Sequence, residues 1–387
     1  MEYRKVSELA RQIRGVSYKP EDIHDRLDKD AVILLRANNI SGGKINFDDI
    51  VYVDRRKVSN EQYLRKGDVL ICASSGSKQL VGKAATVDFD RECTFGAFCK
   101  VVRPNPDIAG YLGVYFQSNR YRQKISEVAI GANINNIRNE HIDDLELLVG
   151  NSDENAEVIE TITLLQCIID RRKEQLEKLD ELVKARFVEL FGEPRSNPFE
   201  YPKTMLKNSC KVVTGNTPSR TVAEYYGDYV EWIKTDNIVP GVLNPTKATE
   251  YLSEKGMVAG RTVDKGSVLM ACIAGSVASI GRVCITDRKV AFNQQINAII
   301  PEKYNTLFLY ILLQMSKDYL IEDINMSLKG ILSKSKLEGK EFIIPPVELQ
   351  NQFAAFVTQA DKSKAVIQKA LDEAQLLFDS LMQKYFG

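Results

Sequence analysis

The chain has 387 residues, 44% of them hydrophobic and 27% charged, and its 52 basic residues balance 52 acidic ones. This composition is typical of a folded globular protein of two or three domains and excludes an intrinsically disordered chain. No apolar run approaches the roughly 18 residues that a membrane helix requires, and no apolar signal core follows residues 1–5, so we expect a cytoplasmic protein.

The reactive residues exclude several kinds of enzyme. The only histidines are His24 and His141, and the seven cysteines include no CxxC pair, so the sequence predicts neither a zinc site nor a histidine-based triad. We expect both histidines to be structural or solvent-facing, and the cysteines to be reduced and mostly buried. The segment Gly76-Ser77-Lys78 lacks the rest of a GxxxxGK[ST] phosphate loop.

In chain order, residues 1–150 come first and carry strand-like apolar runs at 31–35 and 68–72, separated by Gly, Pro and Asn turns. A short helical pattern follows at 108–117. These features predict a β-rich α+β domain over residues 1–150.

Residues 151–192 change character, because no Gly or Pro occurs between Asn155 and Phe191. This predicts a helix of about 37 residues, or about 55 Å. Its apolar residues keep the 3–4 spacing of a coiled-coil seam, interrupted by Arg172 and Arg186. The predicted seam residues are Ile162, Leu165, Ile169, Leu176, Leu179, Val183 and Leu190.

The same succession then repeats. Residues 193–345 carry strand-like runs at 230–233, 267–273 and 296–300 and a helical pattern at 307–319, which predicts a second β-rich domain. Residues 346–387 follow Pro345 and form a second predicted helix, with Lys364 interrupting its seam. This seam consists of Val357, Ala360, Ile367, Leu371, Ala374, Phe378, Leu381 and Tyr385.

The two halves align as copies of one unit. Residues 66–88 (KGDVLICASSGSKQLVGKAATVD) align without gaps on 265–287 (KGSVLMACIAGSVASIGRVCITD) at an offset of 199. The offset drifts from 200 to 195 across the half-chain, as in a diverged duplication. We therefore expect an α+β fold in which two β-rich domains are separated by two long antiparallel coiled-coil helices, with an internal pseudo-twofold repeat.

The neutral total charge hides an uneven distribution. Residues 1–150 hold 23 basic and 21 acidic residues, and 193–345 hold 19 and 16, whereas the first helix, 151–192, holds 6 and 10. The slight basic excess of the two domains is compatible with phosphate contacts and equally with ordinary solvated faces.

Ordered motifs make the chain resemble the specificity (S) subunits of type I restriction–modification systems. Residues 215–219 (GNTPS) resemble the family's G-x-T-P segment, residues 232–238 (WIKTDNI) its W-I-x-x-x-D-I strand and loop, and residues 345–350 (PPVELQ) its P-P-x-x-x-Q helix opening. Residues 293–295 (NQQ) follow at the expected interval, whereas the first half has residues 95–98 (FGAF) at the corresponding place.

The resemblance implies two target-recognition domains, each reading one half of a bipartite, asymmetric site in double-stranded DNA. The helices would set the half-site spacing and dock two adenine methyltransferase (modification) subunits, and motor-nuclease (restriction) subunits would join for cleavage. The chain contains no [ND]-P-P-[YF] methyltransferase motif and no ATP-binding loop. We therefore expect a non-catalytic subunit without a cofactor of its own, with S-adenosylmethionine and ATP bound by the partner subunits.

Side chains that pair with base edges or phosphates are the candidates for DNA contact: Arg or Lys for guanine, Asn or Gln for adenine, and polar loops for phosphate. In the first domain they are Arg36, Asn38, Asn39, Ser74, Ser75, Ser77, Lys78, Gln79, Lys83, Asn133, Asn135, Asn136 and Arg138. In the second they are Thr217, Lys234, Thr235, Asn237, Ser276, Ser279, Arg282, Asn293, Gln294, Gln295, Lys329, Ser333, Lys334 and Lys336.

Three other interpretations remain open from the sequence. The chain could be a two-domain coiled-coil scaffold that binds protein partners rather than DNA, and it would then show no salt-dependent binding to duplex DNA. It could be the recognition chain of a related restriction system that is not type I. It could also be an enzyme with an unrecognised active site, which the scarcity of histidine and the missing nucleotide motifs disfavour.

Overall fold

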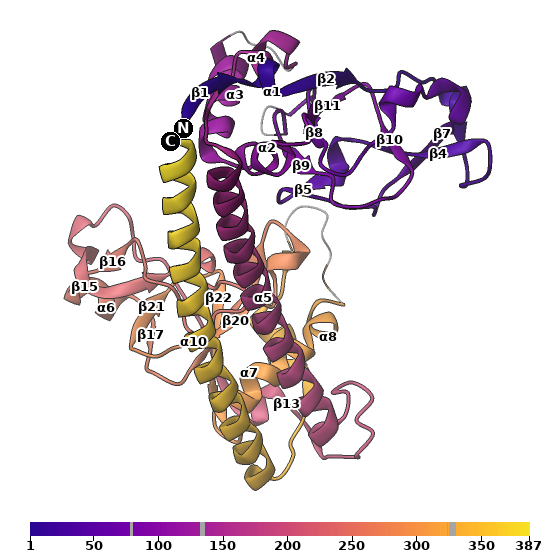
Figure 1. Cartoon of the computed structure of the whole chain (residues 1–387). Helices are drawn as coiled ribbons and strands as arrows, with labels where there is room; N and C mark the ends of the chain where they lie inside the picture. Colours follow the sequence, from indigo (N-terminus) through magenta and orange to yellow (C-terminus); the bar gives the residue numbers. More distant parts are fainter. Residues whose placement is uncertain (78–79, 132–135, 323, 325–329) are drawn as a thin grey trace. The chain divides into compact units, whose positions relative to one another are not determined.

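The computed structural model describes residues 1–77, 80–131, 136–322, 324 and 330–387 (Figure 1). The chain forms two units: Met1–Lys173 together with Lys369–Gly387, and Glu174–Gln368. Each unit therefore contains part of both long helices, because α5 spans Ser152–Phe191 and α10 spans Val347–Phe386.

The first unit is built on a sheet in the order β2-β11-β8-β9 and a second sheet in the order β10-β4-β7-β3. Its strands are β1 (Glu2–Lys5), β2 (Ala10–Arg14), β3 (Ile23–His24), β4 (Ala31–Leu35), β5 (Ile40–Ser41), β6 (Lys44–Ile45), β7 (Val51–Asp54), β8 (Val69–Cys72), β9 (Ala84–Thr86), β10 (Cys93–Phe95), β11 (Cys99–Pro104) and β12 (Glu146–Val149). Its shorter helices are α1 (Val6–Leu9), α2 (Ala109–Tyr115), α3 (Asn119–Gly131) and α4 (Asn139–Asp143).

The predicted runs at 31–35 and 68–72 are confirmed as β4 and β8, and both strands are buried along their whole length. Side chains alternate across β8: Val69 and Ile71 join the core that contains α2 and α3, whereas Leu70 joins the core between the two sheets. A strand covered on both faces needs apolar residues at every position, which explains the unbroken run.

The second unit repeats this plan. The sheet β14-β22-β18-β20 corresponds to β2-β11-β8-β9. The other sheet, β16-β15-β21-β17, contains the parallel pair β15 and β21, which corresponds to the parallel pair β4 and β10 of the first unit. Its strands are β13 (Lys203–Met205), β14 (Cys210–Thr214), β15 (Tyr226–Ile233), β16 (Tyr251–Leu252), β17 (Thr262–Val263), β18 (Val268–Ala271), β19 (Ile273–Ala274), β20 (Val283–Ile285), β21 (Val290–Phe292), β22 (Ile296–Pro301), β23 (Gly330–Ile331) and β24 (Glu341–Ile343). Its shorter helices are α6 (Glu254–Ala259), α7 (Thr306–Met315), α8 (Lys317–Ile321) and α9 (Lys334–Gly339).

Two predicted elements of the second unit are interrupted. The helical pattern at 307–319 divides into α7 and α8 at Ser316, whose backbone (φ −98°, ψ 16°) leaves the helical region. The run at 267–273 divides into β18 and β19 at Cys272, whose amide donates to the Gln295 carbonyl oxygen at 2.8 Å instead of continuing the ladder.

The two long helices run antiparallel (Figure 1). In the first unit, Ile162 near the start of α5 shares a core with Phe386 at the end of α10. In the second unit, Phe187 near the end of α5 shares a core with Phe353 near the start of α10. Each helix has 40 residues, which corresponds to about 60 Å.

The predicted seam is buried unevenly. Ile162, Leu165, Ile169, Val183, Val357, Ala360 and Leu371 are buried, whereas Leu176, Leu179, Leu190, Ile367, Ala374, Phe378, Leu381 and Tyr385 are half-buried. Lys364, which interrupts the seam, is neutralised by Asp180 of α5 at 2.5 Å. The predicted seam left out buried aromatic residues at the helix ends, among them Phe187, Phe191 and Phe353, which contact one another across the helix pair and also pack onto Phe308 of α7.

All seven cysteines lie in the described residues and are free thiols, six of them buried and Cys167 exposed, as predicted. His141 is structural, since its Nδ1 accepts a hydrogen bond from the Arg138 amide at the start of α4. Along the part of the chain that the structure describes, no helix has the length and apolar character to span a membrane.

Candidate nucleic-acid interface

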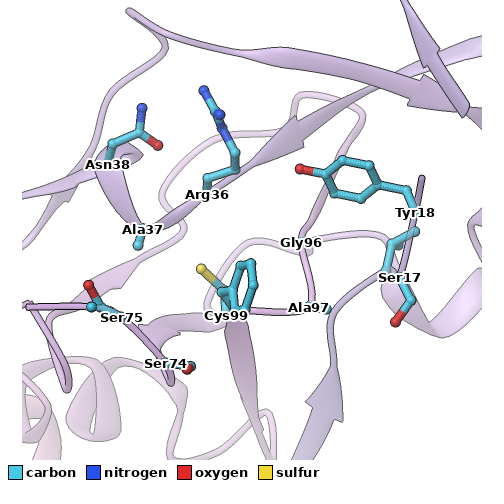
Figure 2. Close-up of a pocket in the computed structure, with 13 residues that line it drawn as sticks. Ser17, Tyr18, Arg36, Ala37, Asn38, Ser74, Ser75, Gly96, Ala97 and Cys99 are labelled. Atoms are coloured by element: carbon cyan, nitrogen blue, oxygen red, sulfur yellow. The ribbon is translucent and has the colours of Figure 1, made fainter. Parts of the chain in front are cut away.

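Loops at one edge of the first unit enclose a cavity of about 610 Å³ (Figure 2). The parallel strands β4 and β10 end at Leu35 and Phe95, so the loops that follow them emerge at the same edge. The Gly96 amide donates to the Leu35 carbonyl oxygen at 2.9 Å, and the Val16 amide donates to the Phe95 carbonyl oxygen at 2.8 Å. These bonds bring residues far apart in the sequence to one cavity.

Gly15 is required for this close approach. A Cβ atom at this position would lie 2.1 Å from the carbonyl oxygen of Gly96, which no real side chain tolerates. The second unit has the same constraint, since a Cβ on Gly215 would lie 2.1 Å from the carbonyl oxygen of Asn293. The two glycines occupy equivalent positions at the ends of β2 and β14.

The turn after β4 presents Arg36 and Asn38 to the cavity. Asp49 holds both side chains: its Oδ2 accepts from Arg36 Nη2 at 2.8 Å and from Asn38 Nδ2 at 2.6 Å. Arg36 Nε is buried and has no hydrogen-bond partner among the described residues.

Asn39, a third candidate on this turn, has a different role. Its side chain is fully buried, and Oδ1 accepts from the Arg36 amide at 2.8 Å, which closes the turn. Asn237 is equivalent in the second unit, where its Oδ1 accepts from the Lys234 amide at 2.9 Å. Both asparagines are turn-forming residues, and we remove them from the set of proposed DNA contacts.

A second cavity of about 350 Å³ adjoins the first and shares Ser17, Ala97 and Cys99 with it. Together the residues that line the two cavities form what we call the first groove. Figure 2 shows Arg36 and Asn38 on the opposite side of the first cavity from Ser17. The groove includes the predicted residues Arg36, Asn38, Ser74, Ser75, Asn136 and Arg138.

Four cationic side chains line the first groove, and two of them are paired with carboxylates: Arg36 with Asp49 and Arg138 with Glu140. Arg14, Lys100 and Arg138 line the second cavity, and Arg36 lines the first. Burial lowers the pKa of Lys100, and the charge of Arg14 lowers it further. A basic groove with amide and hydroxyl groups can neutralise phosphates and also pair with base edges.

The second unit builds the same loop framework. The Asn293 amide donates to the Ile233 carbonyl oxygen at 3.0 Å, and the Asn216 amide donates to the Phe292 carbonyl oxygen at 3.1 Å. These bonds match those of Gly96 and Val16 in the first unit. Asn216 Oδ1 is buried without a partner among the described residues, so this edge also holds an unsatisfied polar atom.

Cations and aromatic rings cluster beside this second framework. Glu250 pairs with Lys234 and, at 2.6 Å, with Arg220, and the hydrogen bond from Lys234 lowers the pKa of Glu250. The Arg220 guanidinium lies 4.5 Å from the ring centre of Tyr226 and 5.1 Å from that of Trp232. The cations are thus held in place by one carboxylate and two rings.

The three amide residues at 293–295 have different roles. Asn293 is buried, and its side chain bonds to the backbone amide of Gln295 at 3.1 Å and to the Gln295 side chain at 3.2 Å. Gln294 is exposed and hydrogen-bonds with Thr217, so two predicted residues from distant segments lie together. Thr235 lies in the turn closed by Asn237.

Other predicted residues lie outside the first groove or engage local partners. Ser276 and Ser279 bond to each other at 3.0 Å, Arg282 bonds to the Ala278 carbonyl oxygen, and Lys334 pairs with Glu338 at 3.5 Å. Ser333 caps α9 by accepting from the Lys336 amide. Ser77 and Lys83 do not line either cavity. Lys78, Gln79, Asn133, Asn135 and Lys329 lie outside the described residues.

Sequence reasoning missed several groove residues. Arg14 and Lys100 lie inside or next to strands, where a lysine or arginine is ordinarily a solvent-facing residue. Ser17 could have been found, because it aligns with the predicted Thr217 at the offset of 200. Nothing in the sequence indicated that Phe98 lies in the groove, because the sequence does not show whether an apolar residue in a loop is exposed.

A comparison with known protein families identifies the family that part of the chain matches. Residues 200–375 match the family described as Type I restriction modification DNA specificity domain. The match confirms the resemblance seen in the sequence.

Two named relatives are specificity subunits of type I restriction enzymes. The specificity subunit of the type I restriction enzyme EcoKI from Escherichia coli K12 is 38% identical over 180 residues, and that of StySPI from Salmonella potsdam is 37% identical over 180 residues. Each alignment covers 46% of this chain and 39% of the relative, so the chain spans well under half the length of these relatives.

Solved structures show the same fold over the whole chain. The S subunit of a type I restriction–modification system from M. genitalium has a TM-score of 0.61 at 14% identity, covering 100% of this chain and 96% of that one. A chain from a study of complex assembly and conformational transition of the type I R-M system has a TM-score of 0.58 at 15% identity, covering 100% and 97%. The α+β architecture with two long helices is thereby confirmed.

Proposed function

We propose that the chain is the DNA specificity subunit of a type I restriction–modification complex. Each β-rich unit reads one half of a bipartite, asymmetric DNA site, with the first groove and the loop edge of the second unit as the reading surfaces. The observation that carries this proposal is that equivalent backbone hydrogen bonds present different side chains in the two units, among them Arg36 and Asn38 in one and Lys234 and Gln294 in the other.

Different side chains on one framework suit an asymmetric target. Arginine pairs with guanine and glutamine with adenine, so the two loop edges offer different base-reading chemistry.

In this proposal the helices α5 and α10 set the distance between half-sites and dock two methyltransferase subunits, and restriction subunits join the assembly. About 60 Å of helix is enough to span one to one and a half turns of duplex, at roughly 34–36 Å per turn. The chain itself directs the methyltransferase and restriction subunits to their DNA site, and S-adenosylmethionine and ATP bind to these partner subunits.

The test is an adenine-methylation map of cells that express this chain with the methyltransferase encoded beside it, against cells with the methyltransferase alone. A split motif that is methylated only when both chains are present is the expected result. A co-purifying complex without any new motif would contradict DNA specificity and point to a silent or degenerate recognition domain, and the absence of both motif and complex would favour a protein scaffold.

Salt dependence gives an independent measurement on the purified complex. Binding to a duplex that carries the motif should weaken as salt rises, with a slope of about 0.9 per phosphate contact in a double logarithmic plot. Arg138→Ala, in the first groove, should reduce that slope by about one while leaving the motif unchanged.

A further inference from the structure

An exposed aromatic side chain lies in the first groove. Phe98 lines the larger cavity and is 71% exposed. In the described part of the chain, which includes all fifteen phenylalanines, Phe199 is the other strongly exposed one. The ring therefore offers an apolar contact within a groove whose other side chains are largely polar.

The backbone around Phe98 is fixed before any ligand binds. Its carbonyl oxygen accepts from the amides of Ala73 at 2.9 Å and Ser74 at 3.0 Å. The Cys99 amide donates to the Gly96 carbonyl oxygen at 2.9 Å. The ring is therefore presented from an ordered loop, which limits the entropy lost on binding.

The equivalent position in the second unit carries a different chemistry. The Gln295 carbonyl oxygen accepts from the amides of Cys272 at 2.8 Å and Ile273 at 3.2 Å, and the Ile296 amide donates to the Asn293 carbonyl oxygen at 3.1 Å. The same hydrogen-bond pattern thus presents a phenyl ring in one unit and an amide in the other. A fixed framework with one variable side chain is the arrangement expected of a specificity-determining position.

The chemistry of the ring narrows what it can read. A phenyl group neither donates nor accepts hydrogen bonds, and the apolar feature of the major-groove edge is the C5-methyl group of thymine. We propose that Phe98 is a specificity-determining residue that reads a thymine methyl group in the half-site bound by the first unit. This inference rests on the proposed function and adds the chemical class that one position recognises.

The experiment uses the full complex of this chain with its methyltransferase and duplexes that carry the mapped motif. Each thymine in both half-sites is replaced singly by deoxyuridine, which removes only the methyl group. One substitution in the first half-site should weaken binding about fourfold, the effect of one buried methyl group. Phe98→Ala should bind the thymine and deoxyuridine duplexes equally, whereas Phe98→Leu should keep most of the preference.

Phe199→Ala is the matched control, because Phe199 is also an exposed phenylalanine but lies in the connection between α5 and β13. It should keep the wild-type thymine preference. The proposal is overturned if no thymine of the first half-site is sensitive to methyl removal, or if Phe98→Ala keeps the preference. Equal weakening on both duplexes by Phe98→Ala without loss of the preference would overturn it too and point to base stacking.

The two proposals fail in different ways. If the wild-type complex recognises no split motif, the proposed function is wrong, and no duplex for the thymine test exists. If the motif is found and only the thymine test fails, the chain keeps its function and Phe98 loses its assigned role. Thermal melting of Phe98→Ala should match the wild type, because the removed side chain is exposed.

Discussion

Arg36 lines the first cavity in a fixed position, because Asp49 accepts a hydrogen bond from its Nη2 at 2.8 Å. A guanidinium held in this way can pair with a guanine edge at little entropic cost.

We expect Arg36→Ala to weaken specific DNA binding about 5- to 150-fold, the range for one lost base pairing of 1–3 kcal/mol. Arg55→Ala is the control, since Arg55 is similarly exposed and also paired, with Glu92, but lies at the other end of β4. Fluorescence anisotropy with a motif duplex measures both. Equal losses in the two proteins would remove Arg36 from the reading surface.

Two glycines that line the same groove, Gly15 and Gly76, test the geometry of the loops. Gly15→Ala should destabilise the protein by about 1–3 kcal/mol, because its Cβ would collide with the backbone oxygen of Gly96. Gly76→Ala, also at the groove, should change little, since a Cβ there meets no atom within 4 Å. Thermal melting should show a fall of about 2–4 °C per kcal/mol for Gly15→Ala alone.

At the residue scale, the sequence could predict which residue types are able to contact DNA, but not whether each side chain is buried or exposed. Asn38 and Asn39 are neighbours of the same type, yet one faces the cavity and the other is buried and closes the turn. That difference depends on contacts with Asp49, ten or so positions further on. Phe98 shows the same limit, because its exposure follows from loop packing rather than from its own type.

At the scale of elements, predictions succeeded where a pattern extends over many residues. The absence of Gly and Pro correctly predicted both long helices, and unbroken apolar runs correctly predicted β4 and β8. The break at Ser316 could not be predicted, because an apolar helical pattern continues on both sides of it. Tertiary packing decides such breaks.

The helix pair should be sensitive to charge at its half-buried positions. We expect the double substitution of Leu176 and Leu179 by Asp to destabilise the pair by about 2–4 kcal/mol, because each substitution would place a carboxylate at a half-buried position of the helix. The methyltransferase should then fail to co-elute on size exclusion. Lys184→Asp puts the same carboxylate at an exposed position of α5 and should leave the complex intact; an intact complex with both leucines replaced would contradict the proposed docking role.

A half-buried carboxylate on α10, Asp361, gives a pH-dependent prediction. Burial raises the pKa of Asp361, which lies near Lys364 and Asp180. The folded state therefore binds this proton more tightly than the unfolded chain, and stability falls as pH rises through the raised pKa. The effect is fully present above the raised pKa and absent below the ordinary pKa of 3.8.

Asp361→Asn should accordingly raise the melting temperature at pH 7 by about 1–3 °C, and the gain should shrink as the pH is lowered towards 4. Asp180→Asn is the control, because it removes the closest partner of Lys364 and should give no gain. Calorimetry at several pH values measures both. A gain that does not change with pH would show that the charge of Asp361 is not its cause.

At the scale of the whole molecule, the repeat predicts independent reading by the two units. Replacing residues 193–345 with the corresponding domain of a relative should change one half of the methylated motif and leave the other half as it was. The reason is that each loop edge is closed by hydrogen bonds within its own unit. A methylation map that showed both halves altered would contradict this modular reading.

The division of the chain also fixes an order of events during synthesis. The first unit needs Met382 and Phe386 for the core that Val6 and Leu9 begin, whereas the second unit is one continuous stretch, Glu174–Gln368. A ribosome adding about 5–20 residues per second finishes that stretch first. The N-terminal part of the first unit is made before the second unit but must wait for its last packing partners until the second unit is finished, and a nascent chain stopped just before Lys369 would leave the first unit, not the second, with apolar surface open to aggregation.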